Sequence, residues 1–242
     1  MLSYHSFGSF LSNMKTYFID FINLFFPDVC AGCRSGLLQG EKLLCVTCHL
    51  VLPRTGFHLR NDNEAMRRLY GRTRLESVAS LWYFNKHSRV QRLVHEFKYN
   101  GHTDIGVMAG KMLGQELLAT PGFSPIDAII PVPLHPSKLL KRGYNQSEYF
   151  GAGLSDALKV PMIPDVLKRI SKGESQTRKR RTGRGQSVEG AFQAVADKIV
   201  PGHLLLVDDV MTTGATLVSC ASPLLNFPGV KLSVATMAYA RR

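Results

Sequence analysis

The stretch LLLVDDVMTTGAT, at residues 204–216, constrains the fold more than any other part of the sequence. Its first four residues are apolar enough to form a strand that is covered on both faces. Two adjacent acids, Asp208 and Asp209, follow, and small hydroxyl-bearing and glycine residues then lead into the apolar segment 216–226. A buried strand that passes through a short turn into a helix is the building unit of a parallel α/β sheet.

The remainder of the chain after residue 76 repeats this alternation. Apolar segments at 76–84, 127–133, 166–170, 203–209 and 231–240 predict strands, and helical spacing predicts helices over 88–100, 104–118, 145–158 and 216–226. The polar segment 58–76 between the cysteines and the first strand indicates a linker or an irregular edge. We therefore expect an α/β fold with a doubly wound, mainly parallel sheet.

The turn after the acids has the composition of a phosphate site. Free N–H groups at a helix start form an anion cradle, hydroxyl groups can supplement them, and glycine permits a close approach. A phosphate alone does not need two carboxylates, but a vicinal diol can donate hydrogen bonds to them. Asp and Thr are common in ordinary turns, although not in this whole pattern. The ligand that this stretch predicts is a ribose 5-phosphate, held by Asp208, Asp209, Thr212, Thr213, Gly214, Ala215 and Thr216.

Two basic segments are candidates for binding further phosphate groups. The first is an expected loop after residues 127–133, where Lys138, Lys141 and Arg142 suit a dense phosphate charge, although a solvated basic loop has the same composition. The second, residues 175–192, contains Gln176, Arg180 and Arg181. It is compatible with a flexible loop that closes over an active site, with a nucleic-acid contact, or with a solvated segment.

Four of the five cysteines lie in two close pairs, Cys30-x-x-Cys33 and Cys45-x-x-Cys48, separated by eleven residues. This spacing is typical of a short zinc ribbon in a reducing compartment, and four thiolates leave no open position, so the zinc is expected to be structural. We divide the chain into an N-terminal helix at 1–27, a zinc-binding module at 28–58 and an α/β domain at 59–242.

The formal net charge of +12 points toward an anionic partner, such as nucleic acid or a phosphorylated substrate. The apolar N-terminal stretch is interrupted by Asp20 and Asp28, and no run reaches the roughly 18 uncharged apolar residues of a spanning helix. We expect a soluble cytoplasmic protein without membrane insertion.

The stretch 204–216 resembles the phosphoribosyl-pyrophosphate (PRPP) signature of type I phosphoribosyltransferases. The order of the cysteine pairs, FKYNGHTDIG, IIPVPLHPSKLLKRGYNQSE, the basic segment and LLLVDDVMTTGATL is similar to that of the ComF/GntX family. Lys98, Tyr99, Arg142, Gly143, Asn145, Gln146 and Gln176 stand at positions that match motifs of this family.

The resemblance implies an N-terminal zinc finger fused to a type I phosphoribosyltransferase domain, with a link to natural competence and the use of DNA. In such an enzyme Asp208 and Asp209 hold the ribose hydroxyls, the turn holds the 5-phosphate, and Mg²⁺ accompanies PRPP. Two hypotheses follow. One is phosphoribosyl transfer with Asp208, Asp209 and Arg142 as catalytic residues; the other is a non-catalytic PRPP sensor that binds single-stranded DNA beside a DNA-uptake helicase.

Overall fold

A computed structural model describes residues 28–170 and 191–241 of the chain. The expected N-terminal helix at 1–27 and most of the second basic segment, including Gln176, Arg180 and Arg181, lie outside these residues. The chain divides into two compact units, Met1–Val51 and Leu52–Arg242.

The described part of the first unit contains the two cysteine pairs and one helix, α2 (Val46–Val51). An isolated antiparallel bridge joins Val29 to Gly36, and the Ala31 N–H donates to the Leu43 carbonyl at 2.9 Å. These contacts bring the segment of the first cysteine pair against the chain that leads to the second.

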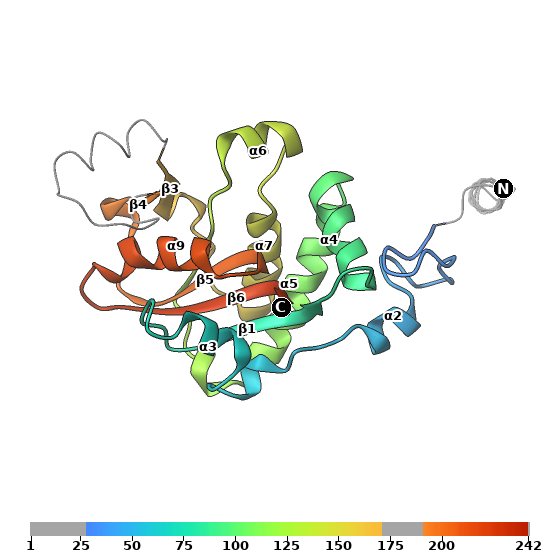
Figure 1. The fold of residues 1–242 in the computed structure, drawn as a ribbon, viewed down its shortest axis with the longest axis horizontal. Helices are drawn as coiled ribbons and strands as arrows, with labels where there is room; N and C mark the ends of the chain where they lie inside the picture. Colours follow the sequence, from blue (N-terminus) through green and yellow to red (C-terminus); the bar gives the residue numbers. More distant parts are fainter. Residues whose placement is uncertain (1–27, 171–190, 242) are drawn as a thin grey trace, which may run out of the picture. The chain divides into compact units, whose positions relative to one another are not determined.

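The second unit contains a four-stranded sheet in the order β1-β6-β5-β2, with every neighbouring pair parallel. Its strands are β1 (Val78–Phe84), β2 (Ala128–Pro131), β5 (Gly202–Met211) and β6 (Val230–Ala240). A separate antiparallel pair joins β3 (Leu167–Arg169) to β4 (Phe192–Ala194). The expected α/β fold with a doubly wound, mainly parallel sheet is confirmed (Figure 1).

Helices cover the sheet because its central strands are apolar on both faces. The helix α9 (Ala215–Leu225) contacts β5 and β6, and its buried side chains join those of Leu204 and Leu206 in one core cluster. The helices α4 (Arg89–Tyr99), α5 (Thr103–Leu117) and α7 (Gln146–Leu158) contact β1, β2, β5 or β6. The helices α5 and α7 touch at Gly110 and Gly153, where a Cβ atom would collide with the backbone of the other helix.

Two helices lie where the sequence predicted no regular structure. The helix α3 (Glu64–Leu69) lies within the expected linker, with the Asn63 side chain accepting from the Met66 N–H at 2.8 Å as its N-cap. The helix α6 (Pro136–Arg142) replaces the expected basic loop. It starts at Pro136 and ends at Gly143, whose φ of 79° terminates the helix, so the prediction of a loop was wrong.

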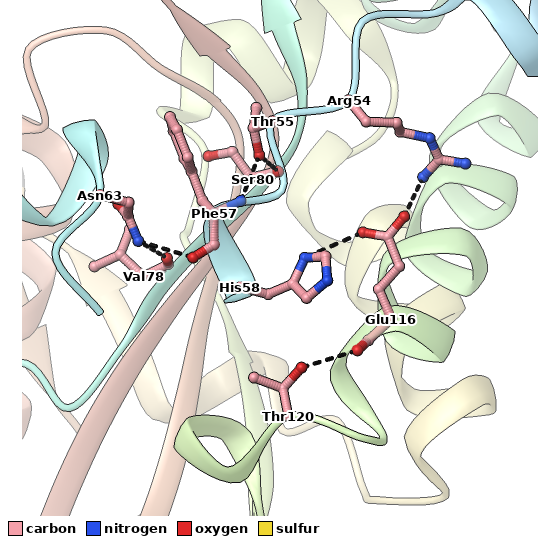
Figure 2. A network of polar contacts seen from close by, with 9 residues as sticks. All are labelled: Arg54, Thr55, Phe57, His58, Asn63, Val78, Ser80, Glu116 and Thr120. Carbon is pink, nitrogen blue, oxygen red and sulfur yellow. Dashed lines mark hydrogen bonds and ion pairs between the residues drawn. The ribbon is translucent and has the colours of Figure 1, made fainter. Parts of the chain in front are cut away.

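Residues 54–63 are held to the rest of the second unit by a network of polar contacts (Figure 2). Glu116 of α5 lies 2.7 Å from the Arg54 guanidinium and 3.3 Å from Nδ1 of His58, while the Asn63 amide donates to the Val78 carbonyl at 2.9 Å. Short 3₁₀ helices cover Phe57–Leu59, Pro121–Phe123, Pro164–Val166 and Ala196–Lys198. None of the helices within the described residues is long and apolar enough to span a bilayer.

Candidate functional site

The two acids lie within β5 and not after it. The strand continues to Met211 because its pairing with β6 continues: Asp208 is in register with Thr236, and Met211 with Tyr239. The expected end of the strand at residue 209 was therefore too early. Both carboxyl groups lie near the carboxyl end of the sheet, which is where ligands bind in open α/β folds.

The side chain of Asp208, a residue of β5, lies in a largely covered position against α7. Its Oδ1 accepts a hydrogen bond from the Ser147 hydroxyl at 3.0 Å and another from the Asp209 N–H at 2.9 Å. Burial, together with the neighbouring charge of Asp209, raises the pKa of Asp208 to about 7, and the two hydrogen bonds oppose this rise only in part.

Asp209 is paired with a lysine from another element. Its Oδ2 lies 3.0 Å from Nζ of Lys98 at the end of α4, and both side chains are less than one fifth exposed. The sequence placed Lys98 in a motif by resemblance but gave it no role. The two acids therefore differ in their surroundings: one is shielded and hydrogen-bonded to a hydroxyl, and the other is ion-paired.

The turn from Thr212 to Thr216 connects β5 to α9. Gly214, the N-cap of α9, has a φ of 73°, and a Cβ atom there would collide with the Leu69 side chain of α3. Glycine is thus required at this position both by the backbone conformation and by packing. Among the described residues, the N–H groups of Thr213 and Gly214 have no recorded hydrogen-bond acceptor.

Two arginines that the sequence analysis did not select contact this turn from outside. Arg68 of α3 donates to the Thr212 carbonyl at 2.5 Å, and Arg72 donates to the Thr213 carbonyl at 2.7 Å. No local pattern could have identified them, because they precede the turn by more than 140 residues.

The first basic segment presents its charges from α6 and its C-terminal end. Lys138 and Lys141 are exposed, and none of the residues of α6 is buried. Arg142 is more constrained, because its guanidinium donates to Oε1 of Gln146 at 2.9 Å and lies 5.2 Å from the centre of the Tyr99 ring. Tyr99, which contacts this arginine, and Lys98, which pairs with Asp209, are adjacent residues at the C-terminal end of α4.

The four clustered cysteines form a site that could hold a zinc ion. The sulfur atoms of Cys30, Cys33, Cys45 and Cys48 all lie within 4.8 Å of one another. Sulfurs around a tetrahedral zinc with bonds of about 2.3 Å are separated by about 3.8 Å, so the thiols fit this ion. The N–H of Cys45 donates to the Cys30 sulfur at 3.3 Å, and a hydrogen bond with the Ser35 hydroxyl holds the pKa of Cys33 at about 6.

Comparison with curated proteins finds relatives along most of the chain. Competence protein F of Haemophilus influenzae is 39% identical over 93 residues, which cover 38% of this chain and 41% of that protein. DNA utilization protein YhgH of Escherichia coli O157:H7 is 29% identical over 201 residues, covering 81% of this chain and 84% of that protein. The chain is similar to these competence and DNA utilization proteins. Competence protein ComFC of Bacillus subtilis is a further relative, 27% identical over 82% of this chain and 79% of that protein.

Solved structures similar to this chain include two phosphoribosyltransferases. Adenine phosphoribosyltransferase from Saccharomyces cerevisiae matches with a TM-score of 0.37 and 19% identity, over 59% of this chain and 71% of that one. Orotate phosphoribosyltransferase from Aeropyrum pernix matches with a TM-score of 0.34 and 18% identity, over 72% and 80% of the two chains. Comparison with protein-family profiles gives no match.

Proposed function

We propose that this protein is a member of the ComF family and that it binds PRPP at the carboxyl end of β5. Asp208 and Asp209 accept hydrogen bonds from the ribose hydroxyls, and the turn Thr212–Thr216 takes the 5-phosphate through its N–H and hydroxyl groups. One observation carries this proposal: the two acids, which differ in their surroundings, lie directly before the turn. In that turn the N–H groups of Thr213 and Gly214 have no acceptor among the described residues. Such N–H groups at a helix start favour an anion.

The reaction that fits these groups is transfer of the phosphoribosyl group. The bond between the anomeric carbon and the pyrophosphate oxygen breaks with its electron pair leaving on pyrophosphate, and a nitrogen nucleophile forms the new bond. Arg142 stabilises the departing charge, with Lys138 and Lys141 nearby in the chain, and the acids fix the position of the ribose. Mg²⁺ would neutralise charge on the pyrophosphate, and its preference for oxygen ligands and substrate phosphates suits the carboxylates of this site.

A second function is favoured by the charge of the exposed surface. The chain carries a net charge of +12, and α6 exposes Lys138, Lys141 and 89% of Leu140. A PRPP sensor that binds single-stranded DNA would need such a basic surface but no catalysis. The names of the relatives connect those proteins with competence and DNA utilization, which supports this second function. We propose that this protein acts in the cytoplasm, in the handling or use of imported single-stranded DNA. Its proposed partner there is a DNA-uptake helicase.

The cysteine site completes the proposal. We assign it a structural zinc ion, because four thiolate ligands leave no coordination position for a substrate. A folded module of this small size needs such an ion, since it can bury little apolar surface.

Calorimetry with PRPP and Mg²⁺ tests the binding step, and release of pyrophosphate in the presence of a panel of nucleobases tests catalysis. Wild-type protein should bind PRPP, and the double variant Asp208→Asn/Asp209→Asn should bind it at least about tenfold more weakly. Binding without pyrophosphate release, combined with salt-dependent retention of single-stranded DNA, would favour the sensor. Absence of PRPP binding to zinc-loaded wild-type protein refutes both forms of the proposal.

A further inference from the structure

The phosphate turn is held from outside by the segment formed by α3 and Arg72. Besides donating to the Thr212 carbonyl, Nη1 of Arg68 donates to the Ala240 carbonyl at 2.9 Å, and the Arg68 guanidinium lies 4.3 Å from the centre of the Tyr239 ring. Arg68 is thereby fixed against the end of β6. Leu69 packs against Gly214, so three neighbouring residues of the turn are each contacted by this one segment.

These contacts determine where the N–H groups of the turn point. In a trans peptide the C=O of one residue and the N–H of the next point in opposite directions. The only cis peptide among the described residues is Ser124–Pro125, so the peptides of the turn are trans. When Arg68 binds the Thr212 carbonyl, the Thr213 N–H points away from α3. When Arg72 binds the Thr213 carbonyl, the Gly214 N–H does the same.

We propose that Arg68 and Arg72 are positioning residues for the phosphate cradle. By binding the carbonyls of Thr212 and Thr213, the two arginines direct the N–H groups of Thr213 and Gly214 toward the anion. They also place two positive charges behind the turn. This inference rests on the proposed function, since it assigns the organisation of the same phosphate site. Neither arginine needs to touch the ligand, because each already donates to a backbone carbonyl.

The test compares Arg68→Met, Arg72→Met and the double variant with the matched control Arg67→Met. Arg67 lies on the same helix, its side chain is 63% exposed, and it pairs with Asp62 at 3.6 Å. Calorimetry uses two probes: ribose 5-phosphate, which needs the turn, and Mg²⁺-pyrophosphate, which is assigned to the Arg142 region. Trp82, the single tryptophan and fully buried in β1, reports by fluorescence whether each variant is folded at the assay temperature.

We expect each single variant to bind ribose 5-phosphate about tenfold more weakly, and the double variant more weakly still, because each lost hydrogen bond is charge-assisted. Affinity for Mg²⁺-pyrophosphate should stay within about twofold of wild type, and Arg67→Met should match wild type with both probes. Arg72→Lys should recover part of the loss, since an ammonium group can still donate one hydrogen bond to the Thr213 carbonyl.

Wild-type binding of ribose 5-phosphate with no loss in the double variant overturns the inference and leaves the proposed function intact. An equal loss for both probes, with a lower melting temperature, also overturns it, because the arginines then only tie α3 to the sheet. If wild type binds neither probe, the proposed function fails first. Should the double variant not fold, the wild-type protein still gives an answer by NMR. Adding ribose 5-phosphate must shift the amide signals of Thr213 and Gly214, and unchanged signals refute the orientation that we assign.

Discussion

Replacing Asp208 by asparagine should stabilise the protein above neutral pH while weakening PRPP binding. Asparagine keeps an oxygen that can accept from the Ser147 hydroxyl and the Asp209 N–H, but it removes the carboxylate charge from its covered position. Burial and the charge of Asp209 raise the pKa of Asp208 from its ordinary value of 3.8 to about 7, which means that ionising this group costs the folded protein free energy.

The magnitude follows from linkage. Because the pKa is higher in the folded state, the folded protein binds more protons than the unfolded chain between about pH 4 and pH 7, and stability falls as the pH rises through this window. The full penalty above pH 7 is about 4 kcal/mol as an upper bound. Between pH 5.5 and pH 8.5 the advantage of Asp208→Asn over wild type should grow by about 2 kcal/mol.

The assay is urea unfolding followed by Trp82 fluorescence, at several pH values between 5.5 and 8.5. Taking the difference between variant and wild type removes the pH dependence of groups that do not interact with Asp208, including the cysteines of the first unit. Asp62→Asn serves as the control, because its side chain is 80% exposed and its variant should show no widening difference. If the difference between Asp208→Asn and wild type stays constant, or if wild type is the more stable at pH 8.5, the electrostatic account of this acid is wrong.

Three further outcomes are expected. Gly214→Ala should lower the unfolding free energy by about 1–2 kcal/mol for its left-handed backbone, and by more for the collision with Leu69; unfolding in urea measures this, and an unchanged midpoint contradicts it. Lys98→Met should cost about 2 kcal/mol by leaving the Asp209 carboxylate without its partner, and adding Asp209→Asn should restore most of it in a double-mutant cycle; additive losses would count against the pair. Metal analysis should find about one zinc per chain, and Cys48→Ser should reduce this content; zinc-free folded protein would rule out the assigned site.

The sheet was predictable because short segments of sequence are enough to indicate each of its strands. The apolar runs before Asp208 and before Pro131 are too short for core helices and are bounded by turn residues, so the order of strands and helices follows from the sequence. The continuation of β5 to Met211 was not predictable in the same way, because aspartate is rare in strands and two aspartates stand at positions 208 and 209. Pairing with the long strand β6 outweighs that local preference.

The helices α6 and α3 were not predicted, for different reasons. The helix α6 carries readable signals, with Pro136 at its first position and Gly143 just beyond its end, and the density of basic residues masked them. The helix α3 is short and its buried side chains, Ala65 and Leu69, are few, so it depends on its contacts with the rest of the fold. Its burial against the turn is a tertiary effect that no window of sequence contains.

The site residues divide along the same line. The acids and the turn lie in one stretch and were found together, whereas their partners Ser147, Lys98 and Arg68 come from three separate helices. A carboxylate pair in sequence says nothing about which lysine or hydroxyl will face it. The partners determine the electrostatics, so the chemistry of the site required the fold.

Those partners also answer why two carboxylates can stand beside a phosphate site. Near pH 7 Asp208 is partly protonated in the ligand-free protein, because burial and the charge of Asp209 raise its pKa to about 7, and the charge of Asp209 is matched by the Lys98 ammonium at 3.0 Å. The group of three therefore carries little net negative charge and repels an anionic ligand far less than two free carboxylates would. A ribose diol that donates to Asp208 favours its ionised form, since an ionised carboxylate accepts hydrogen bonds more strongly. Ionisation of Asp208 is thereby coupled to the hydroxyl groups that stabilise it. Before the ligand binds, the phosphate turn a few residues away faces less negative charge than two free carboxylates would present.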